Sequence, residues 1–158
     1  MGTETPLHAA DHWLGGPGSV PVSVMLLRDD VLTLPETATL SSDLTSYEIA
    51  NGGNYTSGTG VAMPDLTAAY DTTAGIFELG YTTATVTSTP TNLTVAGVGW
   101  VVWIDAATTT GAAIISAVKL DASTSIDAGP LHVQLQESAY IAGSYPIFRL
   151  TRVPVSGS

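Results

Sequence analysis

Residues 98–104 of the chain read Val-Gly-Trp-Val-Val-Trp-Ile, and this stretch decides the fold class. Successive side chains of a β-strand point to opposite faces of its sheet. Trp100, Val102 and Ile104 would therefore share one face, while Val101 and Trp103 would share the other. Because both faces are apolar, the stretch predicts a central strand that is buried on both sides.

Shorter segments with a period of two surround this strand and predict further β-strands. Threonine, a good strand former, occurs 23 times, and 16 Gly and 9 Pro residues supply turns. The sequence therefore predicts an all-β fold, an antiparallel β-sandwich or jelly-roll-like barrel over residues 19–158. The segments expected as strands are 19–28, 76–81, 82–88, 98–104, 114–120, 131–136 and 145–153, with one helical turn near 41–44.

Residues 1–18 are predicted to form an extended N-terminal arm, because Gly15-Gly16-Pro17-Gly18 makes a flexible break before the first strand. Trp13 and Leu14 lie just before that break. Such an apolar pair has two interpretations: it packs on its own domain, or it docks on a neighbouring subunit.

Charge and composition exclude several classes of function. The net charge is −10 with only one Lys and three Arg, so the chain lacks the clustered cations that nucleic acid or an anionic membrane requires. Without cysteine it can form neither disulfides nor thiolate metal sites. No apolar run has the length of a membrane helix, and no signal peptide is visible at the N-terminus.

Reactive side chains are present, but none falls in the pattern that a specific chemistry needs. His8 and His12 would provide two zinc ligands where three or four are required. No Gly-x-Ser-x-Gly turn accompanies His132, and no motif supports a pair of carboxylates for glycoside hydrolysis. We therefore predict no enzymatic activity, no catalytic residue, no cofactor and no metal. The acidic residues considered were Glu48, Glu78 and Glu137 for hydrolysis, and Asp29, Asp30, Asp105, Asp121 and Asp127 for calcium.

A second stretch, residues 24–63, carries a resemblance to a known group of proteins. It begins with Val-Met-Leu-Leu at 24–27 and crosses a polar loop. It then continues as Tyr-Glu-Ile at 47–49, Gly-Gly at 52–53 and Tyr-Thr-Ser-Gly at 55–58. This order resembles a pattern in small virion structural proteins of tailed bacteriophages, in which a V-x-L-L strand leads through a Thr/Asp-rich loop to Y/N-E-I/V-x-G-x-G-Y-T-x-G-G. The resemblance directly covers about a quarter of the chain.

The resemblance implies a non-enzymatic virion structural protein. Within that class we expect a capsid decoration or minor capsid protein on the outer capsid surface, bound to the major capsid protein or other virion subunits. Virion parts are repeated by symmetry, so we expect a homo-oligomer, with a trimer as the working assumption. A tail or tail-tip component is the first alternative. The second alternative is a carbohydrate- or receptor-binding module, in which Tyr140 and Tyr145 would line a site at a loop end of the sandwich.

Four aromatic residues and one leucine are the candidates for subunit contact: Trp13, Leu14, Tyr47, Tyr55 and Trp103. Each has a purely structural alternative. Tyr47 and Tyr55 would cover a sheet edge beside glycines that shape a turn. Trp100 and Trp103 point to opposite faces of one strand, so at least one of them is expected in the core.

Overall fold

The computed structural model describes residues 19–106 and 111–151, with no account of the side chains of residues 19 and 20. Apart from one short 3₁₀ helix, its regular elements are all strands, and the strand pairs with a defined register are antiparallel. The predicted all-β class is confirmed. The elements are β1 Ser19–Arg28, η1 Ser41–Tyr47, β2 Val61–Asp71, β3 Ile76–Tyr81, β4 Thr85–Thr87, β5 Leu93–Asp105, β6 Ile114–Gly129, β7 His132–Gln134 and β8 Tyr145–Thr151.

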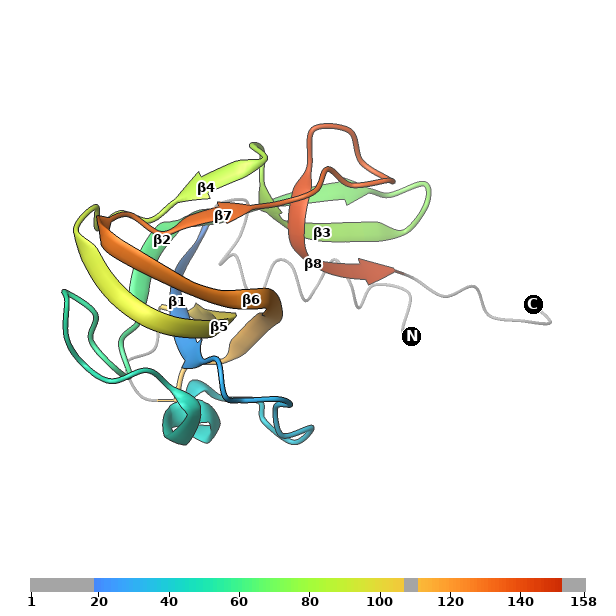
Figure 1. The fold of residues 1–158 in the computed structure, drawn as a ribbon. Helices are drawn as coiled ribbons and strands as arrows, with labels where there is room; N and C mark the ends of the chain where they lie inside the picture. Colours follow the sequence, from blue (N-terminus) through green and yellow to red (C-terminus); the bar gives the residue numbers. More distant parts are fainter. Residues whose placement is uncertain (1–18, 107–110, 152–158) are drawn as a thin grey trace. The chain divides into compact units, whose positions relative to one another are not determined.

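Backbone pairing joins six strands in the order β6-β5-β1-β2-β3-β8 and leaves β4 and β7 as a separate pair. Figure 1 shows the long β5 and β6 side by side, as their register requires. The described residues fall into two compact units. The large unit comprises Pro21–Pro64 and Thr87–Val133, and the small unit includes Asp65–Val86 and residues 134–151. The predicted single domain over 19–158 stays a prediction, and the predicted arm lies outside the described residues.

Strand β5 is central in the large unit, as its two apolar faces predicted. It lies between β6 and β1, and Val102 is fully buried while Trp103 is 1% exposed. Met25, Leu27 and Leu44 pack with Val102 in the core. The helix η1 thus covers one face of the β1–β5 pair, and its Leu44 is the side chain that it buries there.

Strand β3 is the buried centre of the small unit, where all six of its residues are buried. It pairs with β2 on one side and with β8 on the other. The Phe77 ring lies between two aromatic neighbours, 5.4 Å from the Tyr70 ring and 6.4 Å from the Phe148 ring, centre to centre. These contacts form one face of the small sheet. Glu78 occupies the other face, opposite Arg149 in the register of β3 and β8.

Candidate functional site

The carboxylate of Glu48 is the hub of a hydrogen-bond network in the large unit. Its side chain is only 6% exposed. The Tyr55 hydroxyl donates to Oε1 at 2.5 Å, and the Ser57 hydroxyl donates to Oε2 at 2.8 Å. The N–H of Gly58 lies 2.9 Å from both oxygens. Neutral donors of the chain itself therefore satisfy both oxygens, which offsets the cost of burying the charge.

Tyr55 connects this hub to the core strand β1. Its hydroxyl donates to Glu48 and accepts the N–H of Leu26 at 3.0 Å. The N–H of Ile49, the residue after Glu48, donates to the Leu26 carbonyl at 3.0 Å. Glu48 and Ile49 thus form a short antiparallel bridge with β1. Burial, together with the hydrogen bond to the Glu48 carboxylate, raises the pKa of Tyr55 well above its ordinary value of 10.0. The tyrosine therefore remains a neutral donor at physiological pH.

Glycines let the loop that follows Glu48 lie against the core strands. A side chain at Gly53 would meet the Thr94 carbonyl of β5 at 1.8 Å, and one at Gly60 would meet the Val24 carbonyl of β1 at 2.5 Å. Both residues have positive φ, 56° and 75°, which favours glycine. The Thr94 N–H also donates to the Gly53 carbonyl at 2.8 Å. The loop is thus attached to β5 as well as to β1.

The outer surface of this loop contrasts with its attached underside. We call residues 50–59 the staple loop; all of them except Tyr55 are exposed, and all of those exposed are small or polar. Asn51 contributes inside the loop, where its Oδ1 accepts the Ser57 N–H at 2.6 Å. Both oxygens of Glu48 accept hydrogen bonds from the chain itself. The network therefore acts as an internal support that holds the exposed staple loop in place.

The residues of the resembling motif therefore converge on one network. Glu48, Tyr55 and Gly58, which the sequence pattern singled out, lie together around one carboxylate. The sequence analysis did not identify Ser57 as a member, nor Glu48 as the centre. The sequence did contain one signal for this network: a lone glutamate, Glu48, precedes a short loop in which the polar Ser57 is followed by Gly58.

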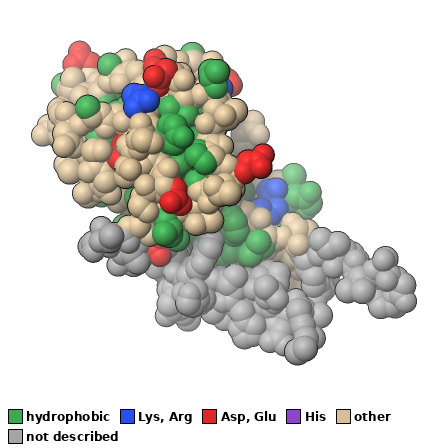
Figure 2. Space-filling view, turned by 90° about the horizontal axis from the view of Figure 1, so that it is seen from below, with side chains coloured by type: hydrophobic (Ala, Val, Ile, Leu, Met, Phe, Trp, Pro, Cys, Tyr) green, Lys and Arg blue, Asp and Glu red, His purple; other side chains and the backbone are tan. Residues whose placement is uncertain are grey.

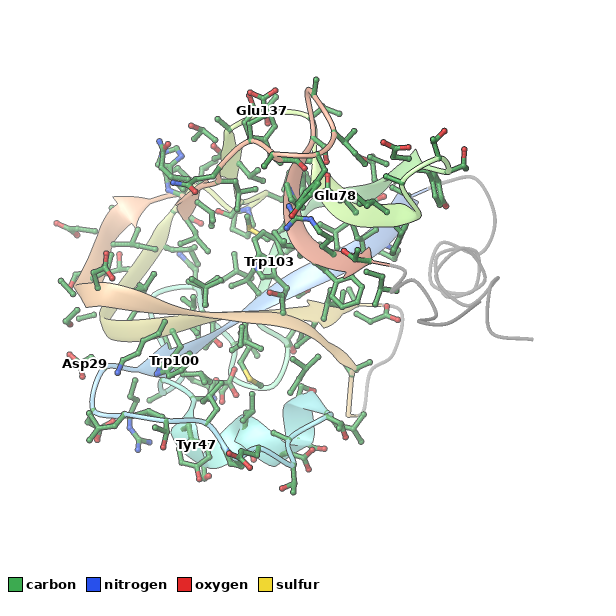
Figure 3. The ribbon with its side chains drawn as sticks, turned by 90° about the vertical axis from the view of Figure 1, so that its right-hand side faces the viewer. Asp29, Tyr47, Glu78, Trp100, Trp103 and Glu137 are labelled. Atoms are coloured by element: carbon green, nitrogen blue, oxygen red, sulfur yellow. The ribbon has the colours of Figure 1, made fainter. Side chains whose placement is uncertain are left out.

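The candidates for subunit contact are in different environments. Tyr55 is 2% exposed and Trp103 is 1% exposed, so both side chains are buried, and their role in subunit contact stays a prediction. Tyr47, the last residue of η1, is half-buried and packs against the core. Trp13 and Leu14 lie outside the described residues. Figure 3 shows Trp103 among other side chains between the strands and Tyr47 close to the helical turn.

Trp100, which was not proposed for contact, is the more exposed tryptophan of β5. It is half-buried, because the loop after β1 covers only part of its ring. Its indole N–H donates to the Val31 carbonyl at 2.8 Å. The Lys119 ammonium lies 5.8 Å from the ring centre and donates to the Leu32 carbonyl at 3.1 Å. This loop is thus held over β5 by two side chains, and Trp103 on the opposite face is the core tryptophan.

Two of the other reactive residues considered from the sequence, Asp29 and His132, have structural hydrogen bonds. Asp29 Oδ2 accepts the Ser123 hydroxyl at 2.6 Å, and His132 Nδ1 lies 2.9 Å from the Thr87 hydroxyl. Within residues 19–106 and 111–151, no group of three or more His, Asp or Glu side chains is placed to hold a metal ion. His8 and His12 lie outside that part of the chain.

Glu78 forms a second buried carboxylate site, in the small unit, and its side chain is completely buried. Its Oε2 accepts the Arg149 Nε–H and the Ser138 hydroxyl, both at 2.7 Å. Its Oε1 is buried without a hydrogen-bond partner among the described residues. The guanidinium of Arg149 also lies 4.7 Å from the ring centre of Tyr140. Glu78 and Arg149 come from the neighbouring strands β3 and β8.

No helix in the described part of the chain is long and apolar enough to cross a membrane. Comparison of the chain with protein-family models, with curated proteins and with solved structures found no match.

Proposed function

We propose that this chain is a non-enzymatic structural protein of a tailed-bacteriophage virion, a capsid decoration or minor capsid protein. The observation that supports this proposal is the network around Glu48. The motif that resembles phage virion proteins is built as an internal support, with Tyr55, Ser57 and Gly58 bound to one carboxylate. This arrangement supports a role in assembly. The polar groups of the motif hold the loop in place, and the exposed residues of the loop form an ordered surface that a partner can contact.

The staple loop is the surface that we propose for contact with a neighbouring virion subunit. It is exposed, it carries small polar side chains, and it is attached to β1 and β5 from below. A contact loop that is already ordered loses little conformational freedom when it binds, so more of the interaction energy appears as affinity. The contacts that attach the loop to β1 and β5 therefore matter for binding, even though they do not touch the partner.

The proposed partners are the major capsid protein or other virion subunits, together with further copies of this chain. A homo-oligomer, taken as a trimer, would present several staple loops to a symmetric lattice, and linked contacts multiply affinity without new chemistry. The N-terminal arm with Trp13 and Leu14 would add contacts of the same kind. The charge of −10 supports a partner other than nucleic acid or an anionic membrane. Charged side chains are few and scattered on the face in Figure 2.

Immunogold electron microscopy of particles from the phage that encodes the chain tests the location. Label distributed over the heads is the expected result. Label confined to the tail or its tip would assign the protein to the tail, the alternative location. Particles without label, and without the chain by mass spectrometry, would refute a virion role.

A matched pair of variants tests the staple loop. Thr56→Arg places a long cationic side chain on the exposed loop, and Thr82→Arg makes the same change at an exposed threonine of the small unit. We expect purified T56R to bind particles that lack the protein at least tenfold more weakly than wild type, while T82R binds normally. Equal binding of T56R and wild type would exclude the staple loop as the contact. Removal of residues 1–17 tests the arm in the same assay.

A further inference from the structure

The loop between β7 and β8, residues 137–144, holds an exposed tyrosine in a fixed position. Tyr140 is 59% exposed. The Ser138 hydroxyl oxygen accepts the N–H of Tyr140 at 3.0 Å and that of Ile141 at 3.1 Å, while the hydroxyl donates to the buried Glu78. One serine thus ties the backbone on both sides of the Tyr140 ring to the interior of the small unit.

A second set of contacts closes the loop and fixes one face of the ring. Glu137 Oε1 accepts the Gly143 N–H at 2.8 Å. The Arg149 guanidinium lies 4.7 Å from the Tyr140 ring centre, and its Nε–H is bound to Glu78. Arg149 is therefore held from the inside and supports the tyrosine ring on one side. Figure 3 shows Glu78 beside β8 and Glu137 in the loop above it.

Beside Arg149 the surface of β8 is hollowed. A depression of about 200 Å³ is lined by Pro146, Ile147, Phe148 and Arg149. Pockets for drug-sized ligands measure roughly 300–1,000 Å³, so this depression suits a single ring. An exposed aromatic ring, a guanidinium and a small depression thus lie within one short segment of the chain.

We propose that Tyr140 and Arg149 form a binding site for a neutral sugar ring, a pyranose. The exposed Tyr140 ring offers a flat apolar surface to the C–H groups on one face of a pyranose. The guanidinium supplies hydrogen-bond donors for sugar hydroxyls. Glu78 already balances the charge of Arg149, and Glu137 adds a negative charge nearby. The site therefore has no excess positive charge to select an acidic sugar.

The surroundings of Tyr140 favour a sugar over a protein partner. Stable protein interfaces bury on the order of 1,200–2,000 Å² and centre on apolar anchors in a desolvated patch. In the described part of the small unit, Tyr70 and Tyr140 are the only large exposed hydrophobic side chains. Tyr70 packs on Phe77, whereas Tyr140 is beside Arg149, across the sheet from Phe77 in the register of β3 and β8. Tyr140 is thus a single exposed aromatic ring beside a charged group.

The experiment is a nuclear magnetic resonance titration of the full chain. The probes are methyl β-galactopyranoside, methyl α-glucopyranoside and N-acetylglucosamine, each tested separately. We expect at least one of them to shift amide signals of residues 137–149 and to receive saturation from the protein at its ring protons. Tyr140→Ala should weaken this binding about tenfold or more, whereas Tyr140→Phe, which retains the ring, should bind within about threefold of wild type.

Two further variants keep the test interpretable. Tyr70→Ala removes the other exposed tyrosine of the small unit and should leave sugar binding unchanged. Arg149→Lys keeps the charge beside Glu78 but loses the planar group, and should weaken binding. Absence of shifts with all three sugars overturns the proposal, because all share the pyranose ring face. Shifts confined to other residues, or a virion-subunit contact that Y140A abolishes without any sugar binding, would also overturn it. The sugar titration uses the isolated chain, so its result does not depend on the virion role.

Discussion

Glu48 in the large unit and Glu78 in the small unit are both buried carboxylates, but the chain satisfies them in different ways. Glu48 is bound by neutral donors alone: two hydroxyls and one backbone N–H. Glu78 is bound by a cation, Arg149, and by one hydroxyl, and its second oxygen has no partner among the described residues. The first arrangement involves no other charged side chain, whereas the second includes a cation whose side chain is 35% exposed.

The two networks therefore have different roles: the Glu48 network supports a loop, and the Glu78 network links the interior of the small unit to an exposed side chain. Neutral donors hold the Glu48 carboxylate, and all three, from Tyr55, Ser57 and Gly58, belong to the staple loop, so the network orders this loop. The ion pair of Glu78 extends through Arg149 to the exposed Tyr140 ring. We therefore expect the Glu48 network to determine stability, and the Glu78 network to be tolerant of joint replacement.

The largest expected effect comes from Glu48→Ala. The change leaves the buried Tyr55 hydroxyl and the partly buried Ser57 hydroxyl and Gly58 N–H without their acceptor, and it opens a cavity. We expect the free energy of unfolding to fall by about 3–4 kcal/mol. Urea unfolding followed by circular dichroism measures it, with Glu36→Ala, an exposed glutamate, as the matched control within about 0.5 kcal/mol of wild type. A loss below that of the control would show that the network does not stabilise the fold.

Arg149→Met should have the next largest effect. It leaves the buried Glu78 without a cation, which costs several kcal/mol for a fully buried pair. Because Arg149 is 35% exposed, solvent reduces the effect, and we expect a loss of about 2–3 kcal/mol.

The double variant Glu78→Met with Arg149→Met sharpens the comparison. Replacing both members of a buried ion pair by apolar side chains is often neutral, so the double variant should recover most of the stability lost in R149M. Glu48→Met has no such partner to remove, because its donors include a backbone N–H. If the double variant is no more stable than R149M, then the two carboxylates are equally indispensable and the contrast is wrong.

Tyr55→Phe tests one branch of the Glu48 network. It removes the hydroxyl that joins the Leu26 N–H to Glu48, and leaves the Gly58 N–H on the same oxygen. We expect a loss of about 1–2 kcal/mol in the free energy of unfolding.

The pH dependence of that loss gives a second readout. Since burial raises the folded-state pKa of Tyr55 above its ordinary value of 10.0, the stability it contributes is fully present below pH 10. It is lost as the pH rises beyond 10, where the unfolded chain ionises first. The difference between wild type and Y55F should therefore shrink above pH 10. A difference that stays constant in that range would show that Tyr55 is not held neutral by its site.

The strands were predictable from the sequence wherever one physical signal dominated. Alternation located residues 19–28 and 76–81, which are the bounds of β1 and β3, and the two apolar faces of β5 identified the central strand. β2 was not predicted as a strand, because Pro64 and Asp65 interrupt its pattern. β6 extends to Gly129, well beyond the predicted 114–120. Its second half was not predicted as strand, because it is largely exposed and its sequence carries no apolar alternation.

The candidate sites were less predictable than the strands. Tyr55, an expected contact residue, is buried, and its hydroxyl joins Glu48 in the same segment to Leu26 on β1, which is distant in sequence. Such a pairing depends on tertiary structure and has no local pattern. Glu78 did have a signal, since a lone acid between Phe77 and Leu79 in a short apolar strand requires a partner. With only four cations in the chain, Arg149 was one of few choices.

Asp43 provides an exposed counterpart to Glu48 and the smallest expected effect. Its Oδ2 accepts the N–H groups of Leu40 and Thr39, both at 3.0 Å, and these bonds lower its pKa from the ordinary value of 3.8. A lowered carboxyl pKa contributes stability that is present above pH 3.8 and is lost as the pH falls through the folded-state pKa. We therefore expect the Leu40 amide signal to titrate with a midpoint below 3.8, and Asp43→Asn to abolish that titration. Because Asp43 is exposed, D43N should change the urea midpoint far less than any variant of Glu48. A midpoint at or above 3.8 would mean that the backbone N–H donors do not favour the ionised carboxylate of Asp43.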